Sequence, residues 1–138
     1  MTPQNLSYQS LPGPADISRT AFSNGITLLT RSNFNSQSVT IKGYLQAGSI
    51  SDPADKLGLA ALSADALTTG TRQHDFKALH NRIESLGASL SFSSGVLSTG
   101  FSGLSLAEDL ATLLDLMLEV LVEPSFPEKQ FKRLKAQF

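Results

Sequence analysis

Strand-like and helix-like segments follow one another along this chain in separate runs, and their order constrains the fold more than any single motif. Three early segments are strand-like: residues 19–23 and 26–30 flank an Asn-Gly turn signal, and residues 38–45 alternate between apolar and polar as in a half-buried strand. Two helix-like segments follow, then two strand-like segments, then two more helix-like segments. Because the strands and helices are segregated, we expect an α+β fold, with a largely antiparallel sheet and helices stacked on one face.

Local signals predict where several of these segments begin and end. Asn24-Gly25 predicts a two-residue hairpin turn in which both residues take a positive φ. Asp75 is the predicted N-cap of the second helix, and Gly87 is its predicted left-handed C-cap. The first helix is expected over residues 56–69, ending before Gly70.

The second half of the chain carries signals of the same kind. Residues 89–92 and 96–104 predict a second hairpin around Ser93-Ser94-Gly95. Ser105 and Glu108 have the spacing of a capping box, which predicts the start of a third helix. That helix carries apolar residues all round and is expected to be buried on more than one side. Pro127 is expected to start a fourth helix.

Composition excludes several classes of function. The chain has 138 residues, no cysteine, two histidines and a formal net charge of −1. The lack of cysteine excludes disulfides, thiolate zinc sites, iron–sulfur ligation and thiol nucleophiles. A net charge near zero gives no electrostatic footprint for nucleic acid or an anionic membrane. No apolar run reaches the roughly 18–20 residues of a membrane span, and no signal peptide is visible. We therefore expect a soluble, cytoplasmic chain, with a trimmed signal peptide as the alternative.

The two ends of the chain are expected to differ. Residues 1–17 contain Pro3, Pro12, Gly13 and Pro14 and predict an extended or disordered lead-in, so that one domain occupies residues 18–138. The helical pattern continues to the C-terminus without a stop signal. From this we expect the domain to continue beyond the sequence.

Taken one by one, the polar residues form no catalytic constellation. His74 and His80 are six residues apart, which places them on different faces of a helix and disfavours a shared metal site. An enzyme that uses an unrelated site built around Asp65, His74 or His80 is the least favoured hypothesis. The basic residues of the last predicted helix are expected to form a solvated face, with a partner-binding patch as the alternative; these residues are Lys129, Lys132, Arg133 and Lys135.

Several short motifs, in their order and spacing, resemble the pitrilysin/insulinase metallopeptidase family, which includes mitochondrial processing peptidase. The resemblance covers about residue 18 to the end of the chain. The motifs that carry it are Ser23-Asn24-Gly25-Ile26, Gly43-Tyr44-Leu45-Gln46-Ala47-Gly48-Ser49, Gly70-Thr71, Ile83-Glu84-Ser85-Leu86-Gly87-Ala88-Ser89-Leu90, Glu108-Asp109-Leu110 and Pro124-Ser125-Phe126. The resemblance implies a partial α+β metallopeptidase (processing peptidase-like) domain, one of a set of modules that close around a peptide.

The resemblance also implies where a zinc site belongs. Active members carry the inverted motif His-x-x-Glu-His between the Ala-Gly-Ser and Gly-Thr landmarks, and a distal glutamate completes the site. The motif falls here on residues 61–65, so that Ala61 and Asp65 replace the histidines and Ala64 replaces the glutamate. The distal position falls at or near Leu134. We therefore expect no bound zinc, no other cofactor and no catalysis by this chain alone.

Two functional hypotheses follow from this substituted motif. The first is a non-catalytic subunit or domain that forms part of a peptide-binding chamber and supports a zinc-bearing homologous subunit, or further domains of the same protein. Unstructured peptide is expected to bind by strand addition to the edge formed by Ser89, Leu90, Ser91, Phe92, Ser93 and Ser94. The second is a structural assembly module, resembling respiratory-complex core subunits, that binds no peptide.

Overall fold

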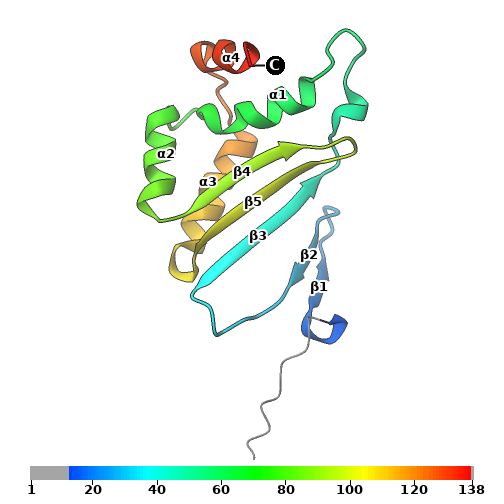
Figure 1. Cartoon of the computed structure of the whole chain (residues 1–138). Helices are drawn as coiled ribbons and strands as arrows, with labels where there is room; N and C mark the ends of the chain where they lie inside the picture. The colour runs from blue at the N-terminus through cyan, green and yellow to red at the C-terminus, as the bar shows by residue number, and fades with distance from the viewer. Residues whose placement is uncertain (1–12, 138) are drawn as a thin grey trace, which may run out of the picture. The chain divides into compact units, whose positions relative to one another are not determined.

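The computed structural model describes residues 13–137, which divide into a first compact unit ending at Ser36 and a second beginning at Gln37 (Figure 1). Most of the predicted lead-in, residues 1–12, lies outside the described residues, as does Phe138. Pro14–Asp16 form a short 3-10 helix, η1. The assignment of residues 18–138 to a single domain stays a prediction.

The first unit contains the predicted N-terminal hairpin. β1 (Ser18–Ala21) pairs antiparallel with β2 (Thr27–Thr30), and every residue of both strands is exposed. The predicted two-residue turn is wrong. The N–H of Gly25 donates to the carbonyl of Phe22 at 3.0 Å, and only Gly25 takes a positive φ, 89°. The loop is therefore three residues long and ends in a left-handed glycine, a common alternative for this sequence.

The second unit is built on a three-stranded antiparallel sheet with the order β3-β5-β4. Its strands are β3 (Ser38–Leu45), β4 (Ser89–Ser94) and β5 (Thr99–Leu106). On one face the central strand buries Thr99, Gly103 and Ser105, whereas the other face carries exposed residues such as Tyr44 and Ser91. Three of the four α-helices pack on the buried face, as the α+β prediction requires, and the last packs against the first (Figure 1).

Four α-helices accompany this sheet, and their order agrees with the prediction. They are α1 (Leu59–Ala66), α2 (Phe76–Ser85), α3 (Leu110–Val122) and α4 (Glu128–Lys135), with short 3-10 helices η2 (Ser49–Ser51), η3 (Leu67–Thr69) and η4 (Ala107–Asp109). The predicted caps of α2 are confirmed. The Asp75 carboxylate accepts the N–H of Ala78 at 2.8 Å, and Gly87 takes a φ of 57°.

The start of α1 differs from the prediction for a structural reason. Gly58 takes a φ of 91° and precedes the helix, which begins at Leu59 instead of residue 56. The carboxylate of Asp52 accepts the N–H groups of Gly58 and Ala60, both at 2.9 Å. A carboxylate from upstream thus satisfies the backbone donors that open α1, and the helix needs no capping side chain of its own.

The predicted capping box at the start of the third helix is wrong. Ser105 pairs with Val39 inside the sheet, is 2% exposed, and donates from its hydroxyl to the carbonyl of Leu106 at 2.9 Å. α3 begins five residues later, after η4. Pairing in the sheet has overridden the local signal.

The core of the second unit lies between the helices and the covered face of the sheet. Its buried members are Ala64, Leu79, Ile83, Phe92, Leu116, Met117 and Val120. The multi-sided burial expected for α3 holds only in part, because Leu118 and Val122 are exposed. No helix in the described part of the chain is long and apolar enough to cross a membrane.

Gly48 generates a stability prediction. The amides of Ser49 and Ile50 donate to the carbonyls of Gly95 and Val96, each at 3.0 Å, so a Cβ on Gly48 overlaps the carbonyl oxygen of Val96. We expect Gly48→Ala to lower the free energy of unfolding by about 1–3 kcal/mol, because backbone cannot move aside easily.

Chemical denaturation measures this effect, and Gly100→Ala is the matched control. A Cβ on Gly100 meets the Tyr44 ring at 3.6 Å, an ordinary contact. Equal stability changes in the two variants contradict the proposed overlap.

Candidate functional site

The three positions assigned to the zinc motif all lie on α1. Ala61 is half-buried, Ala64 is 3% exposed, and Asp65 is exposed. Ala64 belongs to the core cluster together with Phe92 of β4. A methyl group has no lone pair with which to bind a metal or accept a proton, so this helix offers one carboxylate where a zinc site takes three protein ligands.

The remaining candidate ligands do not gather around this helix. Leu134, at the predicted distal position, is half-buried on α4 and carries no ligating atom. Within residues 13–137, no group of three or more histidine, aspartate or glutamate side chains is placed to hold a metal ion. Of the three motif positions on α1, only Asp65 carries a side chain that could bind a metal or accept a proton.

An apolar pocket of about 330 Å³ lies along one face of α1. Ala60 and Ala64 of the helix and Leu67 of η3 line it, and Leu45 and Thr99 at one end of the sheet are also part of its wall. Small side chains leave this hollow next to the motif positions. Its lining is mostly apolar and offers packing surface to an apolar side chain.

The predicted binding strand is β4, and the structure places it beside α1. Among the described residues β4 pairs with β5 only, so its opposite edge has no strand partner. Leu90 and Phe92 point toward the core, while Ser89, Ser91 and Ser93 alternate with them and are exposed. The structure thus brings the substituted motif helix and the open strand edge together.

The two histidines lie in separate environments. The Nε2 of His80 lies 3.1 Å from the carbonyl oxygen of Thr68, and its ring centroid is 4.3 Å from that of Phe76. The Nδ1 of His74 instead lies 2.9 Å from Oε1 of Glu119 on α3. His74 precedes α2 and His80 lies within it, so the expected placement of both on one helix is wrong.

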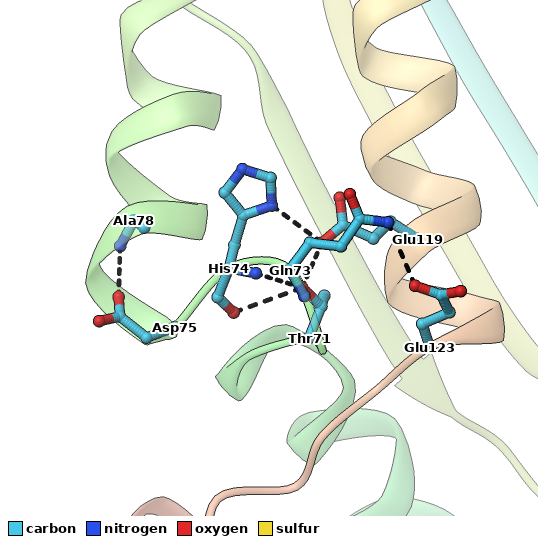
Figure 2. A network of polar contacts seen from close by, with 7 residues as sticks. All are labelled: Thr71, Gln73, His74, Asp75, Ala78, Glu119 and Glu123. Carbon is cyan, nitrogen blue, oxygen red and sulfur yellow. Dashed lines mark hydrogen bonds and ion pairs between the residues drawn. The ribbon is translucent and has the colours of Figure 1, made fainter.

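A polar network joins the segment before α2 to α3 (Figure 2). The hydroxyl of Thr71 donates to the Glu119 carboxylate and accepts the N–H of His74 at 2.8 Å. Gln73 donates to Glu123, the C-cap residue of α3, at 3.1 Å. The hydroxyl and the imidazole bind the same carboxylate oxygen and do not bind each other, so the arrangement is not that of an activated nucleophile.

The Glu119 carboxyl responds to this environment. Its side chain is 9% exposed, and burial by itself raises its pKa. Hydrogen bonds from Thr71 and His74, together with the charge of His74, outweigh burial and bring the pKa of Glu119 below its ordinary value of 4.5. The network is a structural clamp that favours an ionised carboxylate.

Sequence reasoning did not find Glu119. The available signal was a pair of carboxylates, Glu119 and Glu123, at i and i+4 in a segment made mostly of apolar residues. Like charges at that spacing repel on an isolated helix, so a pair of this kind needs partners elsewhere in the fold.

Comparison with known proteins supplies the family. Residues 27–138 match the family described as Insulinase (Peptidase family M16). The chain belongs to this family. The resemblance drawn from the short motifs is thereby confirmed.

This insulinase-family chain spans less than a third of the length of two proteins that it matches. It is 25% identical over 114 residues to the probable mitochondrial-processing peptidase subunit beta of Arabidopsis thaliana, a match that covers 83% of this chain and 22% of that protein. A crystal structure of a peptidase M16 inactive domain from Pseudomonas fluorescens has a TM-score of 0.81 at 24% identity, covering 88% of this chain and 30% of that one. The structural likeness confirms the predicted α+β fold.

The Glu119 clamp predicts a pH-dependent stability difference. A carboxyl whose pKa is lowered by folding stabilises the protein above its unfolded pKa of about 4.5, and this contribution is lost as the pH falls through the native pKa. We expect Glu119→Gln to lower the free energy of unfolding by about 1–2 kcal/mol near pH 6, and by much less near pH 3.

Denaturant titrations at both pH values measure this difference. Glu84→Gln, which changes an exposed carboxylate on α2, serves as the control and is expected to have little effect at either pH. A loss of stability in Glu119→Gln that is equal at both pH values contradicts a contribution from the ionised carboxylate.

Proposed function

We propose that this chain is part of a non-catalytic insulinase-family subunit or domain that helps to form a peptide-binding chamber and supports a zinc-bearing partner. The observation that carries the proposal is the substitution on α1. Ala61 and Ala64 occupy the positions assigned to a ligand and the general base, and Ala64 is part of the core. Loss of the catalytic groups together with retention of the fold favours a role in binding and assembly.

The packing of Ala64 supports a lasting loss of catalysis. A catalytic glutamate needs space and a metal-bound water beside it, whereas Ala64 contacts the apolar core that includes Phe92 and Val120. Asp65 is exposed and can contribute one ligand at most. The relative from Pseudomonas fluorescens is itself described as an inactive domain, which agrees with this proposal.

The open edge of β4 supports peptide binding as the retained activity. An extended peptide can add to such an edge through main-chain hydrogen bonds, with little dependence on its sequence. The exposed hydroxyls of Ser89, Ser91 and Ser93 leave the strand accessible and uncharged. Basic or hydrophobic unstructured peptides are the proposed ligands.

The proposed partner is a zinc-bearing homologous subunit, or further domains of the same protein. The chain spans 22% and 30% of the two relatives, so the proposed chamber needs chain beyond these 138 residues. In this proposal a partner with an intact His-x-x-Glu-His motif supplies the metal, and this chain forms part of the chamber wall and binds the peptide.

Metal analysis tests the non-catalytic assignment. After incubation with zinc and dialysis, we expect less than one zinc per chain by mass spectrometry, and no hydrolysis of unstructured peptides. Asp65→Ala, His74→Ala and His80→Ala are expected to behave like the parent chain. The proposal is rejected if the parent chain binds one zinc and hydrolyses peptides, and if any of these substitutions reduces that activity.

Peptide binding distinguishes a chamber subunit from a structural assembly module. We expect an unstructured basic peptide to slow amide hydrogen exchange in β4 and to leave the central strand β5 unchanged. The same peptide with alternate amides N-methylated keeps its side chains but loses main-chain donors, and it is expected to give little protection. Association with a homologous subunit without any protection of β4 favours the structural module.

A further inference from the structure

A second hollow in the second unit lies between the loop that leads into α1 and the last helix, α4. It has a volume of about 510 Å³, and its apolar lining comes from Leu57, Leu59, Leu62 and Phe131. Leu57 is 81% exposed and Leu59 is 43% exposed. Adjacent leucines left open to water beside an aromatic ring are typical of a surface that another chain covers.

The charges around this groove are mainly positive. Lys56 and Lys135 line it against a single carboxylate, Asp55. α4 as a whole carries four cations and one carboxylate, Glu128, which is already paired with Lys132 at 2.5 Å. A ligand in the groove therefore meets an apolar floor beside the ammonium groups of Lys56 and Lys135, which form no salt bridge with any described residue.

We propose that this groove, lined by Leu57, Leu59, Phe131 and the ammonium groups of Lys56 and Lys135, docks an acidic amphipathic segment of a partner chain. Leucine-like side chains spaced along one helix face fill an apolar groove of this kind, while flanking carboxylates pair with the lysines. The proposed partner segment thus has apolar side chains that enter the groove and acidic side chains on either side of them.

This docking surface is separate from the proposed peptide edge. Peptides that are basic or hydrophobic suit β4, whereas the groove favours the opposite charge, and the two surfaces share no residue. The same positive charge disfavours a second copy of this chain as the occupant, because its own α4 is basic. The groove can therefore bind its partner whether or not β4 binds peptide.

Fluorescence anisotropy on the full chain tests the groove. The probe is a short fluorescein-labelled helical peptide with leucine at i and i+4 and glutamate at the flanking positions. We expect Leu57→Ser to weaken its binding about tenfold, because the peptide loses a buried apolar contact. Leu57 is largely exposed, so this change leaves the fold intact, which circular dichroism verifies.

Charge reversal provides the matched comparison. Lys135→Glu is expected to weaken binding of the glutamate probe and to strengthen binding of a probe with lysine in place of glutamate. Val122→Ser, at a site on α3 that is 74% exposed and does not line the groove, is the control and should change neither. The proposal is overturned if the chain binds the glutamate probe and the lysine probe with equal affinity, or if Leu57→Ser does not change binding of the glutamate probe. It is also overturned if the chain self-associates and Leu57→Ser abolishes that self-association.

Discussion

Leu113 of α3 packs over Gly103 of β5, and this contact sets how closely the helix approaches the sheet. A Cβ on Gly103 falls 3.2 Å from Cδ2 of Leu113, which is itself fully buried. α3 therefore lies low enough on the central strand for the neighbouring turns, Leu116, Met117 and Val120, to enter the core. α1 and α2 contact the neighbouring strand β4, and α4 packs against α1, while the opposite face of the sheet carries exposed residues.

The position of α1 depends on small residues in the same way. Ala64 and Ala66 are buried, which brings the helix close to β4, and Asp52 holds its first backbone amides. Ala64 is also the position to which the family resemblance assigns the catalytic glutamate. On that assignment, the same small side chain that lets the helix pack closely leaves no group there to act as a base.

Features that depend on neighbouring residues were predictable from the sequence. Asp75 and Gly87 act within a turn of their own helix, so their caps follow from local rules. Ser105 has an equally good local signal, but its pairing with Val39 in the sheet decides its role. The length of the Asn24-Gly25 turn was missed because that dipeptide fits a two-residue and a three-residue loop.

Features that need residues far apart in the chain were beyond the sequence patterns. Glu119 meets Thr71 across a separation of 48 residues, and no periodicity links the two. The position of Leu57 beside Phe131 likewise arises only when α4 returns to α1. The assignment of the family motif to residues 61–65 stays a prediction, because it rests on the spacing of landmarks along the chain and not on contacts.

The unpaired edge of β4 has a consequence for stoichiometry. A strand edge offers a single row of backbone donors and acceptors, so one added strand uses all of them. Any extended segment that reaches this edge, from a peptide, a neighbouring domain or another copy, excludes the others while it remains. Occupancy of β4 is therefore competitive and limited to one segment per chain, whatever the sequence of the segment.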